Sequence, residues 1–488
     1  MEIKKQQIGN DCISIVGSKS AEVTCRIDTA DRGGAKRILS VTATPSVSQV
    51  ETVAGQARVE GKVSYKLLYL DAEDHLAGLE YYCDLQTIVE DERIDASRAT
   101  ATSYVADEHA KIHEDVITLD ATVDIDVMQL LGKGGDAIAE ADCECKQATI
   151  TLGRITPIGE EKFDVADEIE TGESIDRILL FDARVGMDDL KSTPSGSTLA
   201  GNVIADIVYL ADGAVKSRTI TIPFAEEIQA DGDIAGTLAV KSSRIVISGE
   251  ENNSIIRVET VLSYSGYRFE GEQVTVIEDM YAEGENLDVH RETIVCNRPA
   301  GRYHLRHKLH VETPLGEETG NLDKVFAALP CRLGLANLVP DEDSVTLEGL
   351  AVVSVLGEGD GIVAATVELP FSAPFGAAGV TSKDLIKGQA IIEGVEAAVK
   401  GGMLDVTVTF GAMIERYEPT AIDYIAEVQA TPKEDAAQAA ISVYFPTHGE
   451  TLWDVARAVG VSPSVLAEHN PNWQDDPRRV IVFRHKAL

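Results

Sequence analysis

The sequence has no long hydrophobic run and few cysteines, and both shortages exclude a class of protein. No window approaches the ~20 apolar residues that a membrane-spanning helix needs, so membrane insertion is not expected. The 7 cysteines in 488 residues are too few and too scattered for a disulfide framework. Because their number is odd and Met1–Gln7 lacks the apolar segment of a secretory signal, we expect reduced thiols in a cytosolic protein. Cys143 and Cys145 would share one face of a strand, but no further metal ligands lie nearby, so bystander thiols are expected.

Basic residues are also scarce. Lys and Arg number 43 against 81 Asp and Glu, which gives a net charge of -38. This charge repels nucleic acid and anionic lipid and argues against both as partners, although solubility alone would explain it. Apolar residues make up 44% of the chain, enough for packed cores, and at roughly 150 residues per domain the length predicts three or four domains.

The first 430 residues contain a threefold repeat. Each copy has a basic-apolar segment followed by a glycine that precedes an apolar strand, and these glycines are Gly61, Gly201 and Gly349. They are separated by 140 and 148 residues, which exceeds the roughly 20–50 residues of a solenoid unit. Each copy is therefore expected to be a domain with its own core.

Strand-like alternation dominates these copies. Apolar and polar residues alternate from Ile117 to Val127 and from Leu404 to Phe410, as expected of antiparallel strands with one buried face. The tripeptides Ile222–Phe224 and Leu369–Phe371 each contain a proline and are expected to stop a strand. The fold class predicted is mainly β, with three tandem β-sandwich-like repeats over 1–165, 166–315 and 316–430. Residues 431–440 are expected to form a linker that leaves the C-terminal segment mobile.

The C-terminal segment has a different pattern, with a strand, two short helices and a closing strand between residues 441 and 483. Thr451 and Asp454 have the spacing of a capping box at the first helix, and Gly460 would end it. Ser462 would cap the second helix, with Pro463 in its first position.

This segment resembles the LysM module. The motifs that carry the resemblance are Gly449–Trp453 and Leu466–Asn472, although Glu450 replaces the usual Asp and Asp476–Arg479 replaces the usual Pro-Gly. The resemblance implies a small α/β module over 441–488 and, in members that bind N-acetylated glycans, a shallow groove between two turns. The candidate groove and rim residues are Gly449, Glu450, Thr451, Leu452, Trp453, Asn470, Pro471, Asn472, Trp473, Arg478 and Arg479.

These residues also have a purely structural interpretation. Leu452 would then be core, Thr451 a cap and Asn470 a turn former. Trp453 fits either interpretation, whereas Trp473 lies beside a polar run and is expected to be exposed, as a hot spot for a protein partner would be. The Arg478–Arg479 edge would attract an acidic partner.

Three such repeats before one LysM resemble the spore coat morphogenetic proteins of clostridia-like spore formers, in which SPOCS domains precede a LysM. The resemblance implies a non-enzymatic scaffold made in the mother cell and recruited to the forespore surface. Its LysM would bind the coat's basement-layer morphogenetic ATPase, and self-association is left open. The alternatives are a peptidoglycan- or cortex-binding wall protein that uses the LysM as a glycan anchor, and a phage tail or baseplate protein.

The sequence has few patterns that are typical of catalytic sites. His304, His307 and His310 are spaced three apart in a strand-like segment, so His304 and His310 would share a face while His307 points away. The sequence has no Gly-x-Ser-x-Gly elbow and no phosphate-binding glycine loop before a helix. We therefore predict no catalytic residue, no metal site and no cofactor.

Overall fold

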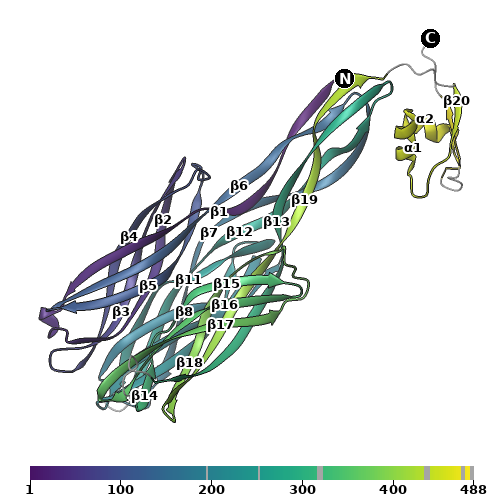
Figure 1. The fold of residues 1–488 in the computed structure, drawn as a ribbon. Coiled ribbons are helices and arrows are strands. Elements are labelled where there is room, and N and C mark those ends of the chain that lie inside the picture. Colours follow the sequence, from purple (N-terminus) through teal and green to yellow (C-terminus); the bar gives the residue numbers. More distant parts are fainter. Residues whose placement is uncertain (194–195, 251–252, 316–321, 434–439, 474–478, 484–488) are drawn as a thin grey trace.

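The structure is a computed structural model that describes residues 1–193, 196–250, 253–315, 322–433, 440–473 and 479–483. Antiparallel strands account for most of these residues, which confirms the mainly β fold class (Figure 1). No helix in these ranges is long and apolar enough to cross a bilayer.

The first unit consists of two three-stranded sheets, with strand orders β1-β6-β5 and β2-β3-β4. Its strands are β1 (Ile3–Asp28), β2 (Arg37–Val53), β3 (Gln56–Leu70), β4 (Leu76–Glu90), β5 (Ala99–His113) and β6 (Val116–Ala141). A short 3-10 helix, η1 (Ala30–Arg32), lies between β1 and β2.

The second and third units repeat this plan, with sheets β11-β12-β7 and β10-β9-β8, then β13-β19-β18 and a sheet of β14, β15, β16 and β17. The strands of the second unit are β7 (Glu144–Glu170), β8 (Arg177–Thr193), β9 (Gly196–Ala211), β10 (Ala214–Ile228), β11 (Asp233–Glu250) and β12 (Asn253–Tyr281). Those of the third are β13 (Glu285–Pro314), β14 (Lys324–Ala328), β15 (Arg332–Asp341), β16 (Ser344–Gly359), β17 (Gly361–Gly376), β18 (Leu385–Lys400) and β19 (Met403–Pro432).

Each unit buries one face of both sheets against the other, which gives the sandwich-like architecture. In the first unit the apolar alternation from Ile117 to Val127 points into a core shared with Val63, Tyr65 and Leu67 of β3. In the third, Leu404 to Phe410 does the same. The period-two pattern therefore predicted the buried face correctly.

Sheet membership places the unit limits at 3–141, 144–281 and 285–432, which differ from the predicted boundaries. The predicted limit at 165/166 falls inside β7, and the one at 315/316 falls just after β13. Both predicted limits therefore lie near the connection between the first and second strands of a unit. The sequence repeat indicates the length of one unit but not the residues at which the units begin and end.

The three glycines of the repeat lie within strands rather than at their starts: Gly61 in β3, Gly201 in β9 and Gly349 in β16. Gly61 and Gly201 pair with strands at the points where β2 and β8 carry bulges. A Cβ on Gly61 would lie 2.1 Å from the Ser46 carbonyl oxygen, and one on Gly201 would lie 2.2 Å from that of Gly186. These two glycines are therefore required by the close approach of a bulged neighbour.

The prolines predicted to stop strands lie inside them instead. Pro223 pairs with Asn202 in β10, and Pro370 pairs with Leu350 in β17. Each of these strands has a single hydrogen-bonded neighbour and is therefore an edge strand, where proline is tolerated.

Six long strands run beyond the sandwiches and form a stalk (Figure 1). The stalk consists of the outer parts of β1, β6, β7, β12, β13 and β19, and all three units contribute to its core through residues such as Ile8, Leu152 and Ile422. At the opposite end of the body the units meet again around Leu68, Leu180 and Leu356. The three repeats therefore pack together as one body and do not form separate domains along the chain.

Contacts between the units use the repeated basic-apolar segment. Arg177 of the second unit donates to the carbonyl oxygen of Leu76 in the first, and Arg37 of the first donates to that of Ile362 in the third. These arginines begin β8 and β2, so the basic residue of the first two copies is explained by a contact with another unit.

One expectation about the thiols is wrong. The structure joins Cys25 of β1 and Cys83 of β4 in a disulfide across the first sandwich, with their Cα atoms 6.3 Å apart. The other five cysteines are free, and Cys143 and Cys145 lie with their Sγ atoms 3.7 Å apart at the tip of the stalk. A separation of 58 residues gives no local signal for the pairing.

Candidate functional site

The terminal module, residues 441–483, contains β20 (Ile441–Tyr444), α1 (Leu452–Val459), α2 (Pro463–His469) and β21 (Val480–Phe483). The predicted capping box is present: the Thr451 hydroxyl accepts from the backbone N–H of Asp454, and the Asp454 carboxylate accepts from that of Thr451. Gly460 ends α1 in the left-handed region at φ 67°. Pro463 begins α2, but the Ser462 side chain bonds to Ser464 rather than capping the helix. The strand-helix-helix-strand order agrees with the sequence.

Hydrogen bonds of the Asn470 side chain connect the end of α2 to β21. Its side-chain NH2 donates to the carbonyl oxygens of Leu466 and Ile481, and its side-chain oxygen accepts from the N–H of Ile481, each at 2.8 Å. Every polar atom of this side chain is therefore used inside the module, which agrees with the structural interpretation of Asn470.

The first candidate turn is also held internally. Gly449 has φ 95°, which favours glycine. The Glu450 carboxylate accepts from the N–H of Thr447 at 2.7 Å and from the Tyr444 hydroxyl at 3.1 Å. Glu450 thus closes the turn, while Leu452 packs against the module core.

Trp453 lies between the module and the stalk. Its indole N–H donates to Oδ2 of Asp279 in β12 at 2.9 Å, and its ring meets that of Tyr281 edge-on with centroids 5.0 Å apart. Arg457 donates to the same Asp279 oxygen at 2.8 Å, and the buried Tyr281 hydroxyl donates to the carbonyl oxygen of Val461 at 2.7 Å. The module is seated on the stalk, in contrast to the mobile tail that the sequence predicted.

The remaining candidate residues are divided. Pro471, Asn472 and Arg479 are exposed, and Trp473, expected to be exposed, is half-buried against the module core. Arg478 lies outside the described residues, as does most of the predicted linker, 434–439. Leu452, Trp453 and Trp473 therefore contact a common core, whereas the polar candidates that the structure describes face water or bond within the module.

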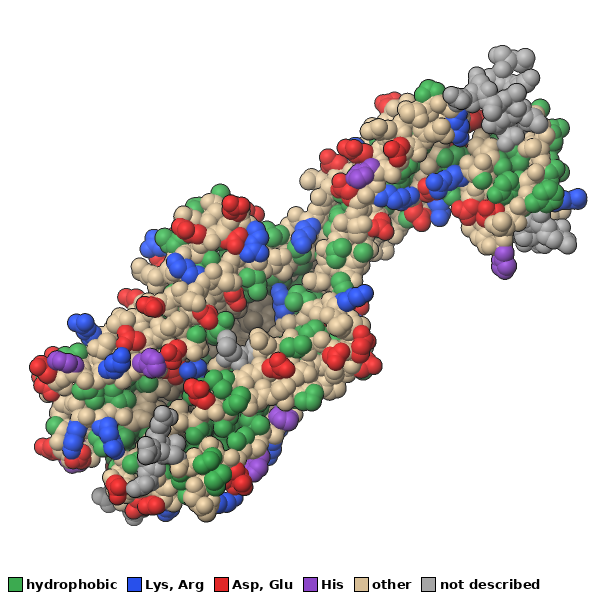
Figure 2. Space-filling view, viewed as in Figure 1, with side chains coloured by type: hydrophobic (Ala, Val, Ile, Leu, Met, Phe, Trp, Pro, Cys, Tyr) green, Lys and Arg blue, Asp and Glu red, His purple; other side chains and the backbone are tan. Residues whose placement is uncertain are grey.

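An exposed apolar face on the terminal module was missed by the sequence reasoning. Ile441, Val443, Phe445 and Ile481 are exposed, and the pairing of Val443 with Ile481 places these two side chains on the same outer face of the sheet. Arg479 is exposed at its end. Figure 2 shows hydrophobic side chains gathered on the outer side of this module. β21 is apolar on both faces, and in β20 the alternation of Ile441, Ser442 and Val443 would place the side chains that are exposed on the buried face, so alternation alone did not reveal which face is uncovered.

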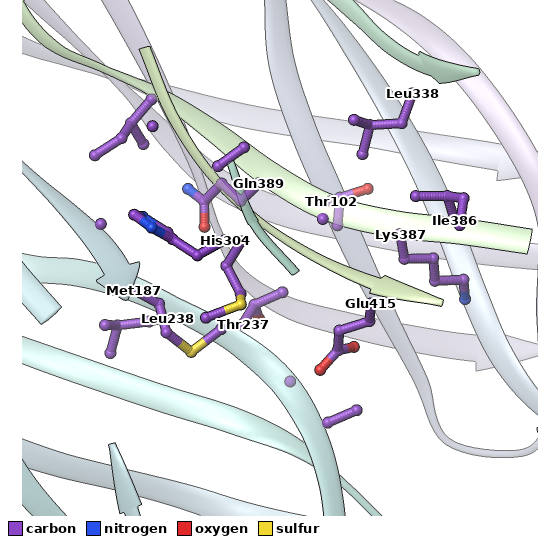
Figure 3. A pocket seen from close by; sticks show the side chains of 18 of the residues that line it. Thr102, Met187, Thr237, Leu238, His304, Leu338, Ile386, Lys387, Gln389 and Glu415 are labelled. Carbon is purple, nitrogen blue, oxygen red and sulfur yellow. The ribbon is translucent and has the colours of Figure 1, made fainter. Parts of the chain in front are cut away.

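A second candidate region is a cavity of about 670 Å³ to which all three units contribute (Figure 3). Its walls are mainly apolar, with Ile13 from the first unit, Met187 and Leu238 from the second, and Ile386 and Met413 from the third. An apolar cavity of this size with a few polar groups has the form of a small-molecule site.

The polar groups on its inner wall bond to one another. Burial raises the pKa of Glu415, which accepts from the Tyr417 hydroxyl at 2.8 Å and faces Arg302 at 3.4 Å. Burial also lowers the pKa of Lys387. Glu415, Tyr417 and Arg302 all belong to the third unit, and Arg302 also donates to the carbonyl oxygen of Leu190 in the second unit, so this group connects the two units.

The three spaced histidines are separated by the structure, as their strand geometry predicted. His304 lies 3.2 Å from Asp188, and His310 lies 3.3 Å from Asp405. His307 packs edge-on against the ring of Phe375 with centroids 5.9 Å apart. They do not form one three-histidine site.

Comparisons of the chain with models of known protein families, with curated proteins and with solved structures found no match. The surfaces described above and the LysM resemblance are therefore the basis for assigning a function.

Proposed function

We propose that the chain is a non-enzymatic scaffold of spore coat assembly that docks through its terminal module onto a coat morphogenetic ATPase at the forespore surface. The observation that carries the proposal is the uncovered apolar face of the terminal module, formed by Ile441, Val443, Phe445 and Ile481. Exposed apolar patches on otherwise polar proteins mark sites of protein contact.

The position of this face favours docking. The terminal module sits at the end of the stalk, away from the sandwiches, so a partner can approach it without meeting the acidic body (Figure 1). Phe445 is 71% exposed, which makes it available as an aromatic anchor. Arg479 lies beside the apolar side chains and would favour a partner with acidic residues at the rim of its interface.

The candidate glycan groove supports the alternative less well. Thr451, Trp453 and Asn470, which would face a sugar, are bonded to Asp454, Asp279 and the neighbouring backbone. The exposed Pro471 and Asn472 keep a peptidoglycan-binding wall protein as the second candidate. Its ligand would be an N-acetylated glycan.

Binding of the full chain to a purified coat morphogenetic ATPase and to purified peptidoglycan separates these functions. The variant Val443→Asp/Phe445→Ser removes the apolar face, and Val53→Asp is a matched control because Val53 is also an exposed apolar residue, 60% exposed, but lies in the first unit. We expect ATPase binding by the parent chain and the control and its loss in the double variant. Retention on peptidoglycan without ATPase binding would support the wall-protein alternative.

A further inference from the structure

We propose that Asp188, His304 and Glu393 form a zinc site that ties the second unit to the third. One ligand atom from each side chain lies within 4.8 Å of the other two. Asp188 belongs to β8 of the second unit, whereas His304 and Glu393 belong to β13 and β18 of the third. A metal bound by all three would therefore cross-link two units of the body.

Two of the three side chains lie at β-bulges. The pairing of β8 with β9 shifts between Met187 and Asp189, and that of β18 with β19 shifts between Ile392 and Gly394. Asp188 and Glu393 are thus the extra residues of their strands. Bulges re-aim a side chain and occur frequently beside functional sites. Both bulges turn a carboxylate towards the same histidine, which a regular strand would not do.

Strand β19, which lies between β13 and β18 in the sheet, leaves space for the Glu393 carboxylate. Arg306 pairs with Gly411 in the register of β13 with β19, and Gly411 pairs with Ile391 of β18. A Cβ on Gly411 would lie 2.2 Å from Oε1 of Glu393. Glycine at this position therefore leaves the space that the carboxylate occupies, and Glu393 reaches across the central strand to Arg306.

Each carboxylate is oriented by a second residue. Oδ2 of Asp188 accepts from the Asn202 side-chain NH2, which leaves Oδ1 facing Nε2 of His304 at 3.2 Å. Oε2 of Glu393 forms an ion pair with Nε of Arg306 at 2.6 Å, but this oxygen is buried and accepts no hydrogen bond from the residues that the structure describes, so both carboxylate oxygens have room for a ligand. Metal-binding carboxylates are commonly held in this way by outer hydrogen bonds.

The donor set selects the ion. One imidazole nitrogen and two carboxylate oxygens suit Zn²⁺, which accepts both donor types and takes a fourth ligand in an open position. All three residues line the central cavity, so that fourth position would face it (Figure 3). His304 lies on the cavity wall with Met187 and Gln389. Water or a small donor in the cavity would complete the coordination.

A second histidine-carboxylate cluster offers a matched control. His310, Glu312 and Asp405 also lie within 4.8 Å of one another, but all three come from one sheet of the third unit and Lys400 pairs with Asp405. His310 is exposed and does not line the cavity among the residues that the structure describes. His310→Ala therefore removes a comparable imidazole without touching the proposed site.

The test is titration of the tag-free full chain with Zn²⁺ by calorimetry and with Co²⁺ by visible absorption. Cys143→Ser/Cys145→Ser serves as the background, because these adjacent thiols are alternative zinc ligands. We expect one ion per chain and a Co²⁺ spectrum of nitrogen and oxygen ligands without sulfur. Asp188→Asn and His304→Ala should each weaken binding by at least about 10-fold, and Asn202→Ala by about 10-fold, as losses of outer hydrogen bonds do.

The controls make every outcome decisive. His310→Ala should bind as the background does, and circular dichroism should show the same strand content in all variants. Absence of ion uptake by the background chain overturns the proposal. Binding that persists in His304→Ala and Asp188→Asn, or that is lost equally in His310→Ala, also overturns it, because the ion would then lie elsewhere.

Discussion

Asp279 is the residue on which the seating of the terminal module should depend most. Its Oδ2 accepts from both Trp453 and Arg457, and its side chain is 14% exposed. Asp279→Ala removes both acceptor contacts while leaving Tyr281 and its bond to Val461 in place. The module should then leave the stalk more often, while the rest of the body stays folded.

The size of the effect follows from the two contacts. A hydrogen bond from a neutral donor to a carboxylate contributes about 1.5–3 kcal/mol. The Arg457 pair adds only about 0–1 kcal/mol, because Arg457 is 55% exposed and solvent screens the pair. Together the two contacts give a loss of about 1.5–4 kcal/mol, which shifts the equilibrium between seated and released module by at least about 10-fold, since 1.4 kcal/mol is about tenfold.

Fluorescence quenching can measure this shift. The chain has 2 tryptophans, so Trp473→Phe leaves Trp453 as the single reporter at the seat. Acrylamide should quench Trp453 more strongly in Asp279→Ala than in the parent, and Tyr281→Phe should give a smaller increase. Asp288→Ala changes an exposed aspartate on the neighbouring strand β13 and should leave quenching unchanged. Equal quenching in Asp279→Ala and the parent would refute the seating account.

Four further predictions concern the fold. Gly61→Ala should lower the free energy of unfolding by about 1–3 kcal/mol in denaturant titrations because its Cβ would meet the Ser46 carbonyl, whereas Gly159→Ala, with open space around it, should not. Burial raises the pKa of the Cys331 and Cys143 thiols to about 12. Iodoacetamide should therefore alkylate both thiols slowly at pH 8 and faster as the pH approaches 12. Rapid alkylation at pH 8 in native protein would contradict this burial. Thr451→Ala should destabilise the terminal module by about 1 kcal/mol. Hydrogen bonds from Thr451 hold the pKa of Asp454 below its usual 3.8. The stabilisation from Asp454 is therefore present above pH 3.8 and is lost as the pH falls through the lowered pKa. Trp453 quenching that does not change on acidification would argue against this cap.

Local patterns predicted the elements well and their assembly poorly. Alternation from Ile117 to Val127 identified both the strand and its buried face, since period two depends on neighbouring residues alone. The capping box at Thr451 and the end of α1 at Gly460 are equally local. By contrast, the Cys25–Cys83 disulfide depends on residues that only the sandwich brings together.

The site was predicted in part for the same reason. The motif around Gly449–Trp453 located the terminal module, but Trp453 contacts Asp279, 174 residues away, so no local pattern showed that the module is seated on the stalk. The proposed ion site also joins residues that are far apart in the sequence. Asp188 and His304 come from different units, and the bulges at Asp188 and Glu393 depend on the partner strand rather than on their own sequence.

The central claim is that the terminal module recruits the chain to the forespore through its exposed apolar face. Fluorescence microscopy of the tagged full chain in sporulating cells tests it most directly. We predict a signal on the forespore surface for the parent and for Val53→Asp, and a diffuse mother-cell signal for Val443→Asp/Phe445→Ser. A diffuse signal from the parent chain throughout sporulation, or forespore localisation that persists in the double variant, would contradict the claim.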